Sequence, residues 1–174
     1  MAIADYSVTT GTLDIKHLEI AQTAKGTDKT VRRSSDDLVR ARSIVAEINR
    51  VIALYRPFIA VAEVPVGAQS ARAAFSNGLC CGLLAAVPLP IIEVSPSEVK
   101  VAAVGSKTAS KEAMIEWAVA KWPEATWMKR KLKGEIVLLN DNEHLADACA
   151  AVNAGILTVQ FAQAIAMMQA MRAA

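Results

Sequence analysis

The amino-acid sequence predicts an α/β fold, in which short strands alternate with longer helices in one domain covering residues 1–174. Short runs rich in β-branched residues alternate with segments whose apolar residues recur at helical spacing. Apolar residues make up 53% of the chain and charged residues 21%, a balance typical of a chain that folds around a core. No internal repeat and no linker divides the sequence, so we expect a single domain.

The N-terminal third predicts a hairpin, a loop and a helix. Residues 1–6 and 12–23 have strand character, and the turn sequence SVTTG lies between them. The polar, basic segment AKGTDKTVRR shows no periodicity and is expected to be a loop. Residues 34–55 begin with Ser and Asp at capping positions and continue with apolar residues at helical spacing, until Pro57 ends the helix.

The rest of the chain continues the alternation. The segment FIAVAEVPV is short, apolar and rich in β-branched residues, so we expect a central strand buried on both faces, with Glu63 as its single charge. Helices are predicted over 67–86, 95–105, 106–122, 141–156 and 157–174, and a further strand over 89–94. The segment MKRKLKGE is predicted to be a basic loop.

Several protein classes are disfavoured by the sequence. The N-terminus lacks the basic and apolar regions of a signal peptide. The most hydrophobic segment, GLCCGLLAAVPLPIIEV, is interrupted by two prolines before it reaches the ~20 residues of a membrane span. Cys80, Cys81 and Cys149 form no CxxC pair, so we expect reduced thiols in a cytoplasmic protein.

Three residues in apolar surroundings are candidates for a metal site. His144 and Asp147 are three residues apart and share one helix face, and Glu63 stands in a predicted strand. Each residue alone is explained as readily by an ion pair or by solvation. If they converge, two carboxylates and an imidazole suit Mg²⁺ or Mn²⁺. Two such ions about 4 Å apart are a common device for phosphodiester hydrolysis.

The segments VAEVPVGAQSA, EVSPSEVKVAAVGSKTASKEAMIEWA and NEHLADACAAV resemble the RuvC-type Holliday-junction resolvases, in particular a phage or prophage branch, within the ribonuclease H-like superfamily. The matching positions, in order, are Pro96, Val99, Lys100, Gly105, Lys111, His144, Asp147 and Ala148. The resemblance implies a mixed sheet flanked by helices with an extra C-terminal helix. It also implies a homodimeric endonuclease that cuts branched DNA with Mg²⁺ or Mn²⁺, with Glu63, His144 and Asp147 as catalytic and metal residues.

The sequence departs from the family at its front, where the family has a first strand that carries a catalytic Asp. In one alignment MAIAD is that strand and Asp5 is the ligand, which forces two strands into TLDIKHLEIAQT with Lys16 and His17 as their turn. In the other, MAIADY and TLDIKHLEIAQT are the second and third strands and the first strand is missing. Strand length and turn chemistry favour the second alignment. It implies either a shortened chain or a member without full activity.

Basic residues gather in three segments, although the net charge is only +2. Solvated surface charge explains any one of them, whereas three clusters together favour phosphate contacts with DNA. The expected DNA-binding residues are Arg32 and Arg33 beside Lys25 and Lys29 in the first loop, then Lys100, Lys107 and Lys111, and finally Lys129, Arg130 and Lys131.

Two functions from different classes remain open at this point. The first is a branched-DNA endonuclease, and the second is a non-catalytic nucleic-acid-binding or assembly protein on the same fold with an incomplete metal site. An ATPase of the sugar-kinase or actin type is disfavoured, because the sequence has no Gly-rich phosphate loop. Gly78 and Gly82 lie four residues apart in an apolar helix, which predicts either close packing on the chain's own sheet or a homodimer contact.

Overall fold

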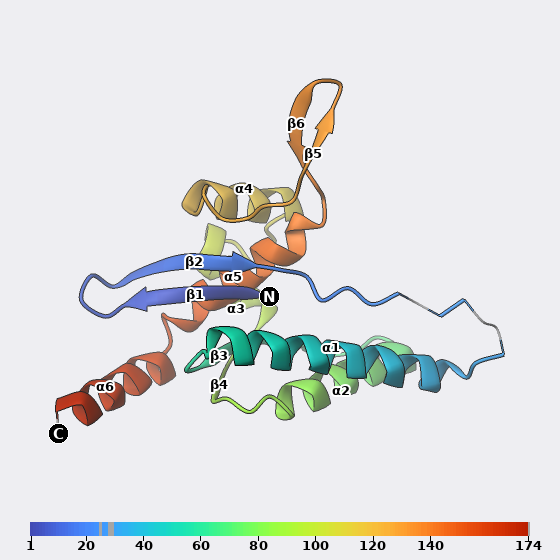
Figure 1. Ribbon diagram of the computed structural model, residues 1–174, viewed down its shortest axis with the longest axis horizontal. Coiled ribbons are helices and arrows are strands. Elements are labelled where there is room, and N and C mark those ends of the chain that lie inside the picture. Colours follow the sequence, from blue (N-terminus) through green and yellow to red (C-terminus); the bar gives the residue numbers. More distant parts are fainter. Residues whose placement is uncertain (25, 28–29, 174) are drawn as a thin grey trace. The chain divides into compact units, whose positions relative to one another are not determined.

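A computed structural model describes the chain except residues 25, 28, 29 and 174 (Figure 1). Lys25 and Lys29 of the predicted basic loop therefore lie outside the described residues. The elements are β1 (Ala2–Ser7), β2 (Thr12–Leu18), α1 (Arg33–Tyr55), β3 (Ala60–Glu63), α2 (Ala71–Ala85), β4 (Ile91–Val94), α3 (Pro96–Val104), α4 (Lys111–Lys121), β5 (Lys129–Leu132), β6 (Glu135–Leu138), α5 (Asn142–Gly155) and α6 (Val159–Ala173). This mixture of helices and strands confirms the α/β prediction.

The chain divides into two compact units. One comprises Met1–Ile20, Val61–Val64 and Ile91–Ala174, and the other comprises Ala21–Ala60 and Pro65–Pro90. The first unit contains β1, β2, β4, most of β3 and the helices α3 to α6, and the second contains α1 and α2. That residues 1–174 form a single domain remains a prediction.

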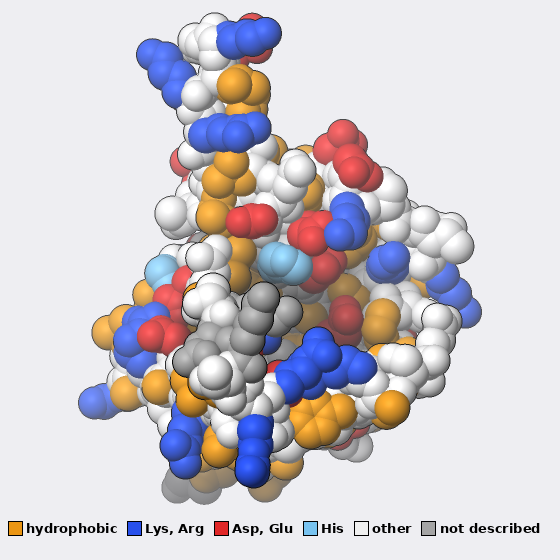
Figure 2. All heavy atoms as spheres, turned by 90° about the vertical axis from the view of Figure 1, so that its right-hand side faces the viewer, with side chains coloured by type: hydrophobic (Ala, Val, Ile, Leu, Met, Phe, Trp, Pro, Cys, Tyr) orange, Lys and Arg blue, Asp and Glu red, His pale blue; other side chains and the backbone are white. Residues whose placement is uncertain are grey.

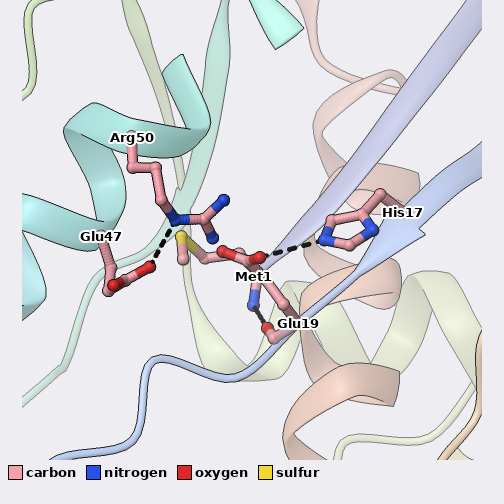
Figure 3. Close-up of polar contacts among 5 residues, drawn as sticks. All are labelled: Met1, His17, Glu19, Glu47 and Arg50. Carbon is pink, nitrogen blue, oxygen red and sulfur yellow. Dashed lines mark hydrogen bonds and ion pairs between the residues drawn. The ribbon is translucent and has the colours of Figure 1, made fainter. Parts of the chain in front are cut away.

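The predicted N-terminal hairpin is present in the first unit. β1 pairs antiparallel with β2, from Ala2 opposite Leu18 to Ser7 opposite Thr12. Gly11 takes a φ of 68° in the turn, a conformation that costs glycine little. The Met1 ammonium donates to the Glu19 carbonyl oxygen at 2.5 Å, just beyond the ladder (Figure 3). Because β2 is one continuous strand, no turn occurs at Lys16 and His17, and the pairing agrees with the second of the two alignments.

β3 and β4 form a separate short ladder. Ala60 N–H donates to Pro90 and Val64 N–H donates to Val94, and this constant sequence offset is the pattern of parallel strands. The described strands form three two-stranded sheets, so this ladder is not hydrogen-bonded to the β1–β2 hairpin. The prediction that β3 is buried on both faces is wrong, because its residues are half-buried and Glu63 is exposed.

Helix α5 is the centre of the first unit. It packs against α3, α4, β1, β2 and β4. Its buried face includes Leu145, Ala146, Cys149 and Ala150, which join Val99 of α3 and Met114 and Ala118 of α4 in one core. Full burial of a side chain such as Leu145 stabilises the fold by about 1.5–3 kcal/mol. A Cβ at Gly155 would lie 2.5 Å from Val61 Cγ2, so only glycine lets this end of α5 approach β3 so closely.

The second unit has an internal ion pair between its two helices. Arg72 of α2 donates from Nη1 and Nη2 to the two Asp37 oxygens of α1, at 2.6 and 2.7 Å. Because Asp37 is buried, this two-point pairing compensates the cost of removing its charge from water. Within α1, Arg50 also pairs with Glu47 at 2.7 Å (Figure 3).

The segment predicted to be a basic loop is instead the β5–β6 hairpin. Leu132 pairs with Glu135, which leaves Lys133 and Gly134 as a two-residue turn. Their φ angles are 49° and 94°, so both central residues have the positive φ that a type I′ hairpin turn needs. The prediction was wrong because it gave most weight to the four basic residues and did not identify Lys-Gly as a turn between two short strands.

The two predicted C-terminal helices are present as α5 and α6, and the chain between them breaks after Gly155. Phe161 of α6 is buried, and its ring meets Tyr6 of β1 edge to face at 4.8 Å between centroids. No single helix in the described chain is long and apolar enough to cross a membrane. α5 and α6 pass that test of length and composition only as a pair, and the pair is bent by 67°.

Candidate active site

Glu63 and Asp147 are carboxylates from different elements whose charges interact. Glu63 is the last residue of β3, and Asp147 lies in the second turn of α5. Burial raises the pKa of Glu63, and the negative charge of Asp147 raises it further, whereas Lys100 acts in the opposite direction. The charges of Glu63 and Asp147 therefore interact within the first unit, and the charge of His144 also acts on Asp147. That these residues hold a metal together remains a prediction.

Asp147 has a raised pKa for related reasons. Desolvation has the largest effect, and the negative charge of Glu143 adds to it from one helical turn earlier. His144, Lys100 and Lys111 lower the pKa in part. The side chains of Glu63 and Asp147 nevertheless remain accessible to solvent. A ligand can thus reach two carboxylates whose negative charges are only partly balanced by neighbouring positive groups.

The local fold fixes α5 at both of its ends. At the C-terminal end, Gly155 allows the close approach to Val61 of β3, two residues before Glu63. At the N-terminal end, Asn142 is 0% exposed and makes three hydrogen bonds. Its Oδ1 accepts from the Met128 N–H, and its Nδ2 donates to the Met128 and Leu139 carbonyls. Asp147 lies between these two anchors.

Two lysines, Lys100 and Lys111, act electrostatically on the acids. Lys111, the first residue of α4, donates to a Glu143 oxygen at 2.6 Å, and this bond raises the pKa of Lys111. The charge of Lys100 on α3 acts on both Glu63 and Asp147. Lys107 lies exposed in the connection between α3 and α4. Two of the three lysines predicted for this region therefore interact electrostatically with the acids.

The other predicted DNA-binding residues are located elsewhere. Lys129, Arg130 and Lys131 are exposed on β5, in the same unit as the acids. Arg32 precedes α1 and Arg33 begins it, in the second unit. The structure places both groups at the surface.

His144 and Asp5 lie differently from Glu63 and Asp147. The His144 side chain is 61% exposed, with Nε2 3.7 Å from a Glu143 oxygen. Asp5 is on β1 opposite Asp14, 75% exposed, and 3.9 Å from the Lys16 ammonium. Asp5 is not among the groups whose charge shifts the pKa of Glu63 or Asp147.

The carboxylates of Glu63 and Asp147 fit a cation site with few protein ligands. Mg²⁺ usually keeps several waters and takes one or two protein carboxylates together with substrate phosphate oxygens. Glu63 and Asp147 are suited to that role. Among the residues that the structure describes, no three His, Cys, Asp or Glu side chains are grouped closely enough to hold a metal by themselves. Two ions would need a further carboxylate.

Two residues of this region were missed as site residues from the sequence. Glu143 adds negative charge beside Asp147, and its position four residues earlier on the same predicted helix was the available signal. Asn142 is the buried anchor of α5, and nothing in the sequence distinguishes it from an ordinary helix-starting Asn.

No protein-family model matches the chain, and no curated protein matches it. Among solved structures it is similar to T. thermophilus RuvC in complex with a Holliday junction substrate. The TM-score is 0.59 and the identity 18%, over 88% of this chain and 82% of that one. Thermus thermophilus RuvC in a second structure gives a TM-score of 0.57 with the same identity and coverage. The chain therefore has a RuvC-like fold.

Proposed function

We propose that this chain is a structure-selective endonuclease that cuts branched DNA of the Holliday-junction type. The observation that carries the proposal is the coupling of Glu63 and Asp147, flanked by Lys100 and Lys111, on a RuvC-like fold. One of the RuvC structures holds a Holliday junction, which supports the choice of a branched substrate. The phage or prophage branch remains a prediction from the sequence.

The chemistry of the site suits a phosphodiester substrate. Glu63 and Asp147 would hold Mg²⁺ or Mn²⁺, with His144 as the further donor that the resemblance implies. When bound, such an ion polarises a phosphate oxygen and activates water. Lys100 and Lys111 would attract the DNA backbone toward the acids. Lys107 before α4 and the basic side chains on β5 would extend the contact and make affinity depend on salt.

A non-catalytic DNA-binding protein on the same fold is the second candidate. It is favoured by the lack of a three-ligand metal group among the described residues. The position of Asp5 beside Asp14 and Lys16 also favours it, because the resemblance implies a further acid at the site. In this alternative the lysines bind DNA and the carboxylates no longer support cleavage.

Cleavage of a labelled four-way junction in Mg²⁺ or Mn²⁺ separates the two candidates. We expect the wild type to cut, and Glu63→Gln and Asp147→Asn to lose about 100-fold or more in rate while still binding the junction. Such a loss corresponds to the several kcal/mol that a bound metal supplies. Glu116→Gln, at an exposed acid on α4, is the matched control and should cut normally.

Binding by the wild type without cleavage in either metal would select the non-catalytic alternative. Absence of junction binding would contradict both candidates.

A further inference from the structure

The β5–β6 hairpin has a surface that the core does not explain. All of its strand residues except Val137 are exposed, and Ile136 is 75% exposed. Leu132 and Leu138 are exposed as well. Figure 1 shows the hairpin projecting beyond α4, with no other described element of the first unit against its far end. Because isolated two-stranded hairpins are marginally stable in water, so much exposed apolar surface calls for a binding partner.

The charges of the hairpin indicate the chemistry of that partner. Four basic residues, Lys129, Arg130, Lys131 and Lys133, accompany a single acid, Glu135. Figure 2 shows blue side chains along the projecting arm with orange side chains between them. This excess of positive charge complements a polyanion, and phosphates are the polyanionic groups of DNA.

The register places basic and apolar side chains on the same face. Lys131 is directly opposite Ile136, and Lys129 is directly opposite Leu138. Directly paired residues of an antiparallel ladder project to the same side. One face of the arm therefore carries two lysines on β5 beside two apolar side chains on β6. Nucleic-acid-binding arms use such a combination when cations hold phosphates and an apolar side chain packs on unstacked bases.

The base of the arm is fixed to the helix that carries Asp147. Asn142 bonds to Met128 and Leu139 on the two sides of the hairpin base, and Leu139 N–H also donates to Met128. Before β5, Trp127 is buried and its indole N–H donates to the Trp122 carbonyl at 2.8 Å. These bonds hold the base of the arm against the start of α5, one turn before Asp147.

We infer that the β5–β6 hairpin is a DNA arm, in which Lys129 and Lys131 contact phosphates while Ile136 packs against unstacked bases at a branch point. This inference rests on the proposed function for its branched substrate. Stacking in linear duplex DNA covers the base faces everywhere except at the two ends, so Ile136 would favour branched over linear DNA. The lysines would contribute to both.

Binding is measured by fluorescence anisotropy on a four-way junction and on a linear duplex, without divalent metal and at several salt concentrations. A 2-aminopurine at the branch point reports unstacking. Ile136→Ser should weaken junction binding about tenfold, abolish the 2-aminopurine response, and leave both duplex binding and the salt dependence unchanged. Ile136→Leu should restore the wild-type behaviour. Leu157→Ser, at another exposed apolar residue of the same unit, is the control.

Lys131→Ala should weaken binding to both DNAs and reduce the salt slope by about one phosphate contact. Two results would contradict the inference that the hairpin is a DNA arm. In the first, Ile136→Ser binds the junction as tightly as the wild type does. In the second, Ile136→Ser loses the same affinity for the junction and for the duplex. Cleavage separates these outcomes from failure of the proposed function. If the wild type binds the junction through Ile136 but never cuts it, the DNA arm is supported and the proposed endonuclease activity is contradicted. If the wild type binds neither DNA, both proposals are contradicted.

Discussion

At the scale of single residues, the candidate site is a place where like charges accumulate. Glu63, Glu143 and Asp147 are three acids, and among the lysines that the structure describes, Lys111 contacts Glu143 and none contacts the other two. The raised pKa values of Glu63 and Asp147 mean that ionising them costs the folded chain free energy. Such a cost at an accessible position is characteristic of binding sites, because a cation or a substrate can relieve it.

A stability measurement tests this cost. A carboxyl whose pKa is raised by folding binds more protons in the folded state, so stability falls as pH rises through the raised pKa. Asp147→Asn should therefore be more stable than the wild type at pH 7, by up to about 1 kcal/mol, since exposed charges are screened. The difference should shrink below about pH 4, where the unfolded carboxyl also protonates. A variant that is less stable at pH 7 would mean that Asp147 has a structural role.

Asn142 should prove structural rather than catalytic. Asn142→Ala leaves the backbone groups of Met128 and Leu139 without their buried amide partner. We expect a loss of about 1–3 kcal/mol, measured by urea denaturation. Asn140→Ala, at an exposed neighbour, should change stability by less than about 0.5 kcal/mol. Equal stability of the two variants would show that the hairpin base is not anchored as described.

At the scale of elements, α4 begins where a phosphate would bind. Ser110 caps the helix by accepting from Ala113 N–H, and Lys111 follows it. The positive end of the helix dipole and the lysine act in the same direction. Because Lys111 is already paired with Glu143, its contact with DNA would compete with that ion pair.

Lys107→Ala and Lys111→Ala should each weaken junction binding and reduce its salt slope by about one phosphate contact. Lys111→Ala should also raise the pKa of Asp147, since it removes a positive charge that now lowers it. Anisotropy titrations over several salt concentrations measure the slopes. Lys121→Ala is the control, because the Lys121 ammonium is hydrogen-bonded to Asn153 and we do not place it on the DNA surface. Unchanged slopes for Lys107 and Lys111 would remove both from that surface.

Elements with strong local signals were predictable from the sequence, and elements defined by long-range contacts were not. The spacing of apolar residues and the caps predicted the helices, and the turn SVTTG predicted the first hairpin. The β5–β6 hairpin was missed because its turn is Lys133-Gly134 rather than Asn-Gly. The burial of β3 was overestimated because the sheet is split into separate ladders, a property of the whole fold that no short segment encodes.

At the scale of the whole molecule, α5 connects three parts of the first unit, which are the hydrophobic core, the acids Glu63 and Asp147, and the β5–β6 hairpin. The same helix packs on both the β1–β2 and β4 strands, carries Asp147 and fixes the hairpin base. From the sequence, the order of Glu63, His144 and Asp147 suggested one site. The spacing of Glu143 four residues before Asp147 would have added it to that site. The role of Asn142 depends on how α5 packs against the hairpin base, which spacing along the chain does not reveal.

A homodimer is the expected assembly, since paired cuts across a junction need two sites at a fixed separation. A Cβ at Gly78 or Gly82 would meet nothing within 4 Å, so the described residues of the second unit leave the glycine face of α2 open. We expect sedimentation to give a dimer at micromolar concentration and Gly82→Glu to give a monomer. Arg42→Glu, at an exposed residue of α1, controls for added negative charge. A wild-type monomer, or a Gly82→Glu dimer, would contradict this contact.

We propose above all that Glu63 and Asp147 form one cation site on this RuvC-like fold. Mn²⁺ binding in the presence of junction DNA, followed by electron paramagnetic resonance, tests it most directly with the wild type, Glu63→Gln, Asp147→Asn and the double variant. We predict that each single variant abolishes the tightest Mn²⁺ binding, and that the double variant loses no more than either one, because both carboxylates hold the same ion. Independent, additive losses from the two variants, or no Mn²⁺ binding by the wild type, would contradict the claim.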